Sequence, residues 1–184
     1  MKTELDAEDL LRRLGLAIKR INELEAELLP TNFMIQIKKS PTADTRTCDF
    51  ANTSKETLLA SSHQHIEDVR KGLQWFRIML HESANVHDHD KISDIDGFHR
   101  DFSTGFKQTT WWDNHRKVNR HHLLQSDGVP QDVNLIDVLD MIADCVMAGL
   151  ARSGSVYPLN IDPEVLMQAF QNTVEVLKKN IEVR

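Results

Sequence analysis

Four long stretches of this chain repeat apolar residues at the spacing of an α-helix, and they constrain the fold more than any other feature. The stretches are residues 6–29, 55–81, 135–151 and 163–181. In each of them, apolar side chains recur three or four positions apart, which gives the predicted helix one apolar face. Such helices bury their apolar faces against one another. The sequence therefore predicts an all-α fold, a helical bundle.

A short segment after the first predicted helix has a different pattern. Larger apolar residues alternate with other residues over residues 33–38, which is typical of a β-strand. The next residues, KKSPTADTRTCDFANTS, have the composition of a loop. We therefore expect one short β-hairpin at most, and this region is either a flap or a plain connector.

The first predicted helix carries a heptad pattern of apolar residues, and Pro30 ends it. Three heptads form only a marginal coiled coil on their own, so the apolar seam must pack either on the domain core or on a second copy of the chain. The order of elements assigns residues 1–30 to this helix, 31–54 to the connector or flap and 55–184 to the helical domain. The seam residues are Leu10, Leu14, Ala17, Ile21, Leu24 and Leu28.

Length and charge exclude several classes of protein. A chain of 184 residues is long enough for one domain with a real core. The net charge of −6 disfavours general nucleic-acid binding, and no apolar run approaches the roughly 20 residues that span a membrane. Cys48 and Cys145 support no disulfide framework, and the N-terminus lacks the apolar region of a secretion signal. We therefore expect a cytoplasmic protein.

The strongest functional signal is the HDHDK stretch at residues 87–91. Adjacent imidazole and carboxylate groups are suitable ligands for a divalent transition metal, namely Mn, Fe, Co, Ni or Zn. The chain holds nine histidines, and further candidates lie on both sides of this stretch. These are His63, His65, His115, His121, His122, Asp137, Asp140 and Asp144.

Helical geometry ranks some of these candidates. His65 shares a stripe with Val69 and Leu73, at the edge of the face that we expect to be buried, whereas His63 faces elsewhere. On one continuous helix over residues 111–124, His115 and His122 share a face and His121 points away, although a break at Arg120 would change that choice.

The three aspartates of the 135–151 helix differ in their surroundings. A solvated acidic face is the simplest interpretation of Asp137. Asp144 lies among the small residues Ala143, Cys145 and Ala148, which allow a close approach of another helix. A carboxylate in such a place needs a partner, and a metal ion is one.

These motifs resemble the HD-domain superfamily of metal-dependent phosphohydrolases. His87-Asp88-x-x-Lys91-Ile92 is similar to its HDxGK element, His65-Ile66-x-x-Val69 to its first-helix histidine, and Ala143-Asp144 with Ala148 to its final AD…A helix. From about residue 63 to 150, the succession HDHDKISDIDGF, NRHH and DMIADCVMAG is more closely similar to an uncharacterised HD-related family frequent in phages.

The resemblance implies a set of functional residues. His65, His87, Asp88 and Asp144 would bind one ion, and His115, His121 and His122 match the extra histidines of members with two ions. Asp88 and Lys91 would be catalytic, with Lys91 as a phosphate contact and Arg116 and Arg120 near the same phosphate. A second register, with His89-Asp90 as the ligand pair, is the less favoured alternative. The Trp111-Trp112 pair either packs in the core, which we favour, or stacks on a base.

The implied function is hydrolysis of a small phosphate ester by a hydroxide that one or two divalent ions activate. A nucleotide is the favoured substrate. A phage-encoded protein of this kind would act in the host cytoplasm. Two alternatives remain: a di-iron oxygenase on the same scaffold, and a non-catalytic phage binding protein that keeps a structural metal. In the last case the N-terminal heptad helix would be the functional surface.

Overall fold

The computed structural model describes Arg13, Leu16, Arg20 and residues 33–40, 50–107, 110–156 and 158–184. It divides the chain into two units, Met1–Met34 and Ile35–Arg184. Arg13, Leu16 and Arg20 are helical. None of the six residues of the predicted heptad seam is among the described residues, so the seam and its expected role in packing or oligomerisation lie outside them.

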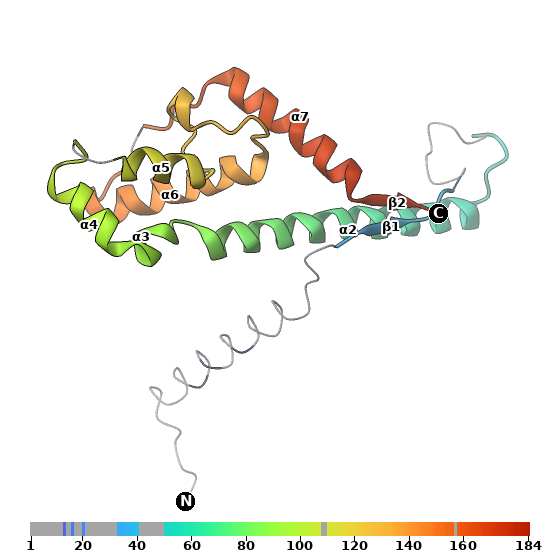
Figure 1. The fold of residues 1–184 in the computed structure, drawn as a ribbon. Helices are drawn as coiled ribbons and strands as arrows, with labels where there is room; N and C mark the ends of the chain where they lie inside the picture. The colour runs from blue at the N-terminus through green and yellow to red at the C-terminus, as the bar shows by residue number, and fades with distance from the viewer. Residues whose placement is uncertain are drawn as a thin grey trace, which may run out of the picture. The chain divides into compact units, whose positions relative to one another are not determined.

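The second unit is mostly helical (Figure 1). None of the helices in the described part of the chain is both long and apolar enough to cross a lipid bilayer. The prediction of an all-α bundle with a minor strand pair is confirmed. The elements in chain order are β1 (Ile35–Ile37), α2 (Lys55–Val86), α3 (Asp90–Ser93), α4 (Ile95–Ser103), α5 (Trp111–Val118), the short 3-10 helix η1 (Ser126–Gly128), α6 (Leu135–Ser153), α7 (Pro163–Lys179) and β2 (Ile181–Val183).

The two strands form a parallel pair, with Ile35 opposite Ile181 and Ile37 opposite Val183. The expected hairpin is therefore wrong, although the strand itself was predicted. Alternation of side chains shows that a segment suits a sheet, but it does not identify the partner strand. Hydrogen bonds from α2 hold the pair in place, since Lys71 Nζ donates to the carbonyl oxygen of Gln36 at 2.9 Å.

Side-chain caps explain where the long helices begin. The hydroxyl of Ser54 accepts a hydrogen bond from the backbone N–H of Thr57 at 3.1 Å, and Asn134 and Asp137 form a capping box at the start of α6. Asp162 caps α7. These caps satisfy N–H groups that the first turn of a helix leaves without partners.

α6 packs against both α2 and α7 (Figure 1). A core cluster lies along α6 and includes the residues just before it in the chain. This packing fixes the segment between α5 and α6 against the body of the fold. The buried members of the cluster are Leu123, Val133, Val138, Met141 and Ala169.

The face of α2 that we expected to be buried is exposed instead. Val69 is 46% exposed and Leu73 is 62% exposed, whereas the buried positions of the helix are Ser61, Trp75 and Ile78. An apolar stripe in a sequence does not show whether another element packs against it. For this reason the buried face of α2 was predicted wrongly.

Candidate metal centre

The C-terminal end of α2 begins the site. The helix ends at Val86, and His87 is its C-cap, with a backbone N–H that donates to the carbonyl oxygen of Ser83. Asp88 then has a φ of +53°, in the left-handed region. This conformation costs a non-glycine residue of the order of 1 kcal/mol. The backbone N–H of Asp88 donates to Oδ1 of Asn119 at 3.1 Å, which stabilises the turn.

The end of α5 brings two more histidines to the same place. α5 ends at Val118, and Asn119 has extended backbone angles. The expectation of one continuous helix over residues 111–124 is therefore wrong, and the break that we considered at Arg120 occurs one residue earlier. Because the chain turns here, His121 and His122 both reach the site, and His121 no longer points away.

Gly128 supports the turn that carries His122. A Cβ atom at this buried glycine would lie 2.4 Å from the carbonyl oxygen of His122. Real Cβ atoms do not approach an oxygen so closely, so the backbone of η1 can pack here only without a side chain.

The structure brings histidines and aspartates from the turn after α2, from α5 and the turn that follows it, and from α6 into three groups that could hold a metal ion. Within each group the ligand atoms lie within 4.8 Å of one another. Two ligands on one ion lie roughly 3–4 Å apart, given bond lengths of about 2.1 Å, so small adjustments close these groups around a cation. The groups are His87 with Asp88 and Asp144, Asp88 with His115 and His122, and His87 with His121 and Asp140.

Asp88 lies at the centre of these groups. Its Oδ1 is 3.3 Å from Nε2 of His115 and 3.6 Å from Nε2 of His121, and its Oδ2 is 3.6 Å from Nε2 of His87. Nε2 of His87 is in turn 3.9 Å from Oδ1 of Asp144. One carboxylate therefore belongs to two groups, and Asp88 would be shared between two ions if both groups were occupied.

The donor atoms fit a cation. Within the described part of the chain, Oδ1 of Asp88 and Nε2 of His115, His121 and His122 are buried and have no hydrogen-bond partner. A buried polar atom without a partner costs about 1–3 kcal/mol. Four such atoms at one place, all from residue types that bind transition metals, are best satisfied together by divalent ions.

Two further carboxylates orient the histidine rings. Oδ1 of Asp140 is 2.7 Å from Nδ1 of His87, and Oδ2 of Asp90 is 2.8 Å from Nδ1 of His115. A carboxylate that accepts the Nδ1 proton of a histidine leaves Nε2 as the lone-pair donor, as in many metal sites. The Nε2 atoms of both rings point to the Asp88 side, where the ligand groups lie.

This arrangement bears on the choice between the two His-Asp pairs. His89 is exposed, and its Nδ1 is bound to the backbone carbonyl of Val86 at 2.8 Å. Asp90 contacts His115 and is absent from the three ligand groups. The geometry therefore favours His87-Asp88 as the ligand pair and gives Asp90 a supporting place.

The electrostatics favour the protonation states that bind metals. Burial raises the pKa of Asp88, but the hydrogen bond from Lys91 and the charges of Lys91, His87 and His115 lower it further, so its pKa lies below the ordinary value. Burial lowers the pKa of His122 to about 3, with smaller contributions from His121 and His115. Burial and His87 lower the pKa of His121. At neutral pH, Asp88 is therefore ionised, and His121 and His122 are neutral.

His65 does not join the site, which corrects the predicted ligand set. It lies on the exposed surface of α2, 22 residues before His87. On a continuous helix this separation is roughly 33 Å. The structure thus brings together His87, Asp88 and Asp144 of the predicted single-ion set, together with His115, His121 and His122.

The three predicted phosphate contacts are all engaged with carboxylates. Lys91 Nζ donates to Oδ2 of Asp88, so it lies at the centre of the site. Arg116 pairs with two aspartates, Asp113 at 2.9 Å and Asp127 at 2.6 Å.

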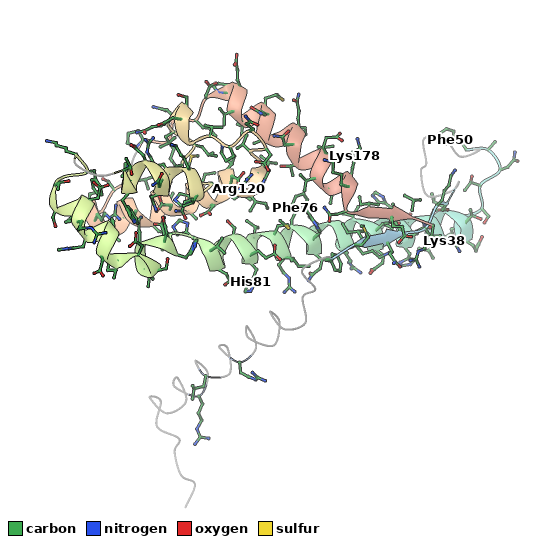
Figure 2. The ribbon with its side chains drawn as sticks, viewed as in Figure 1. Lys38, Phe50, Phe76, His81, Arg120 and Lys178 are labelled. Carbon is green, nitrogen blue, oxygen red and sulfur yellow. The ribbon has the colours of Figure 1, made fainter. Side chains whose placement is uncertain are left out.

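Arg120 is engaged in the same way. Its guanidinium lies beside α6 (Figure 2) and pairs with Asp137 at 2.8 Å and Asp132 at 3.0 Å. Asp137 is 5% exposed, so the interpretation of a solvated acidic face is wrong for this residue. The hydrogen bonds that Arg120 donates to Asp137 and Asp132 raise its pKa.

The Trp111-Trp112 pair packs against the site. Both rings stack on the His115 ring, with centroid distances of 5.1 and 5.0 Å. The contact agrees with packing, the interpretation that we favoured over stacking on a base. It also contributes to the burial of His115, whose exposed fraction is 1%.

Two cavities adjoin the ligand groups. One of about 170 Å³ is lined by His121, His122 and Asp144, together with Trp112 and Cys145. The other, of about 270 Å³, lies on the Asp140 side of His87 and His121 and is lined partly by apolar residues of α2, α5 and α6. The first cavity reaches Asp144, a member of a ligand group, and so gives a small molecule access to the centre.

Sequence reasoning had missed the supporting roles of Asp90 and Asn119. The repeated His-Asp pattern contains Asp90, but a repeat does not show which pair binds and which pair supports. Asn119 precedes Arg120 in the NRHH motif, and the end of α5 at this residue is what gives its side chain a role.

Comparison of the chain with protein-family models, with curated proteins and with solved structures gives no match.

Proposed function

We propose that this protein is a metal-dependent phosphohydrolase that acts on a small phosphate ester, in the first place a nucleotide. Its centre would take one or two divalent ions of the Mn, Fe, Co, Ni or Zn series. The single observation that carries this proposal is the shared position of Asp88, between His87 and Asp144 on one side and His115 and His122 on the other.

Some residues would bind the ions, and others would orient the ligands. His87, Asp88 and Asp144 would hold one ion, and Asp88, His115 and His122 the other, with His121 beside both. A divalent ion in such a site supplies an activated water molecule and polarises a phosphoryl oxygen. Asp140 and Asp90 keep the rings of His87 and His115 in the orientation that presents Nε2.

Lys91 is the favoured phosphate contact. Its ammonium group lies against Asp88, and its side chain is 26% exposed, so it adjoins both the ligands and the solvent. There it would stabilise negative charge that develops on the phosphoryl group. Arg116 and Arg120 are less suited to this role, because each is already neutralised by two carboxylates.

Charge also supports an anionic substrate. Asp88, Asp90, Asp140 and Asp144 carry four negative charges around the site, and two divalent ions with Lys91 would more than balance them. A loaded centre therefore attracts an anion although the whole chain carries a net charge of −6.

The test is a phosphate-release screen. Metal-free protein is loaded with Mn²⁺, Co²⁺ or Zn²⁺ and offered nucleoside mono-, di- and triphosphates and simple phosphomonoesters. We expect release with at least one substrate, loss of activity with EDTA, and loss in Asp88→Ala but not in His65→Ala. Inactivity towards every phosphate ester, in protein shown to contain bound metal, would contradict the proposal.

The same screen separates the alternatives. A site of histidines with one bridging carboxylate also suits two iron ions, so oxygen consumption by iron-loaded protein in place of phosphate release would identify an oxygenase. Bound metal with neither activity would favour a binding protein with a structural metal.

A further inference from the structure

The side chain of Asn119 connects two parts of the metal centre that are distant in sequence. It is 5% exposed and lies at the C-terminal end of α5. Its Oδ1 accepts the backbone N–H of Asp88 at 3.1 Å, and its Nδ2 donates to Oδ1 of Asp90 at 2.9 Å. Nδ2 also donates to the carbonyl oxygen of His115 at 3.1 Å. One amide group thus contacts the shared ligand Asp88, the supporting carboxylate of Asp90 and the helix that carries the ligand His115.

The first contact holds the backbone of Asp88. This residue has a φ of +53°, and a conformation of this kind persists only when neighbouring groups hold it. The acceptor on Asn119 satisfies the N–H group that the turn leaves at the end of α2. The carboxylate of Asp88 belongs to both ion groups, so the stability of this turn bears on both.

The second contact holds the carboxylate of Asp90. Oδ1 of Asp90 accepts a hydrogen bond from Nδ2 of Asn119 at 2.9 Å, and Nδ1 of His115 lies 2.8 Å from Oδ2 and 3.1 Å from Oδ1 of the same carboxylate. Asp90 therefore approaches the His115 ring in a fixed orientation. This contact concerns only the ion group that contains His115, because the His87 ring is oriented by Asp140.

We infer that Asn119 is a positioning residue of the metal centre, whose acceptor holds the Asp88 turn for both ions and whose donor supports the His115 ion alone. The inference rests on the proposed metal centre. This positioning role requires a hydrogen-bond acceptor and a donor on one short, uncharged side chain, and asparagine has both. Glutamine would be one methylene too long, and a carboxylate would place a negative charge against Asp90.

Two variants separate the two contacts. Asn119→Asp keeps an acceptor for the Asp88 N–H group but loses the donor and repels Asp90. Asn119→Ala loses both contacts. Asn114→Asp is the matched control, because Asn114 lies on α5 and is exposed. Asp90→Asn is a second way to weaken the same support, in case either substitution at position 119 fails to fold.

The measurement is Co²⁺ binding to metal-free protein, followed by competition with a coloured chelator and by the visible absorption of the bound ion. The thermal unfolding of each metal-free variant is recorded in parallel. We expect two ions in the wild-type protein and in Asn114→Asp. In Asn119→Asp and Asp90→Asn, one ion should keep its affinity and the other should weaken by roughly 10–100-fold, the usual effect of losing a supporting hydrogen bond. In Asn119→Ala, both ions should weaken.

Other results would overturn the inference in distinguishable ways. Two ions bound at wild-type affinity by folded Asn119→Asp and Asp90→Asn would show that the amide serves only the fold. Equal weakening of both ions in Asn119→Asp would show that its donor has no separate role. A wild-type protein that binds only one Co²⁺ ion would overturn the division of the Asn119 contacts between two ions. A wild-type protein that binds no Co²⁺ would overturn the proposed metal centre itself, and with it this role for Asn119.

Discussion

The histidines at the two ends of α2 have different surroundings. His63 and His65 lie near its start on the exposed surface, and His87 lies at its end, with Nδ1 held by Asp140. Both regions look alike in sequence, because each has histidines close to apolar residues. The difference is the set of supporting groups around each ring, and these groups come from other elements of the fold. A ligand is thus identified by its neighbours in space rather than by its position on a helix stripe.

Apart from the loss of a ligand itself, a large effect on metal affinity should come from removing the support of His87. In Asp140→Asn the shape is kept, but the charge that orients Nδ1 of His87 is lost, and we expect metal affinity to fall by roughly 10–100-fold. Chelator competition measures the change. Asp132→Asn, at a carboxylate whose side chain is 78% exposed, is the control. Equal affinities of the two variants would remove the distinction between the two ends of α2.

A glycine substitution tests the packing beneath His122. Gly128→Ala should lower the free energy of unfolding by about 1–3 kcal/mol, because its Cβ would meet the carbonyl oxygen of His122. Gly72→Ala, on α2, has no atom within 4 Å of the added Cβ and should stabilise the helix by up to about 1 kcal/mol. Urea denaturation measures both. If Gly128→Ala left the free energy of unfolding unchanged, the turn would accommodate the added Cβ atom without strain.

The pH dependence of stability tests the buried histidines. The pKa of His122 is lowered from 6.5 to about 3, chiefly by burial. Between these values the unfolded chain binds a proton that the folded chain does not, so the free energy of unfolding of metal-free protein should fall as the pH is lowered through this window. His122→Gln should make this slope shallower.

The control for this prediction is His65→Gln, which removes one imidazole from the exposed part of α2. Its stability should follow the wild-type slope between pH 6.5 and pH 4. A wild-type slope in His122→Gln would show that His122 takes up its proton equally in both states.

The smallest effect is expected at His65, which the sequence favoured over His63 as a metal ligand. His65→Ala should leave metal affinity and phosphate release unchanged, because His65 is exposed and roughly 33 Å along the helix from His87. Metal analysis after gel filtration gives the result. Loss of an ion in this variant would restore the four-residue set that the resemblance implied.

The helices were predictable because their signals are local. The caps at Ser54, Asn134 and Asp162 and the apolar spacing depend only on residues within a few positions of one another. The parallel pairing of β1 with β2 was not predictable, because alternation carries no information about a partner at the other end of the chain.

The site was predictable in its residue types and only partly in its membership. His87, Asp88 and Asp144 converge as their motifs indicated, and His121 joins because α5 ends at Val118. The exact end of a helix is weakly encoded in its own sequence. Whether one stripe of α2 is buried depends on which other elements pack against it, and the sequence of the helix does not specify them. This is why His65 was wrongly expected at the edge of a buried face.

We infer that one centre for divalent cations is formed by His87, Asp88, Asp144, His115 and His122. Titration of metal-free protein with Co²⁺, in the wild type and in Asp88→Ala, tests it most directly, because Asp88 belongs to two of the ligand groups. We expect stoichiometric uptake by the wild-type protein and none by the folded variant. Equal uptake by both proteins, or no uptake by the wild type, would contradict it.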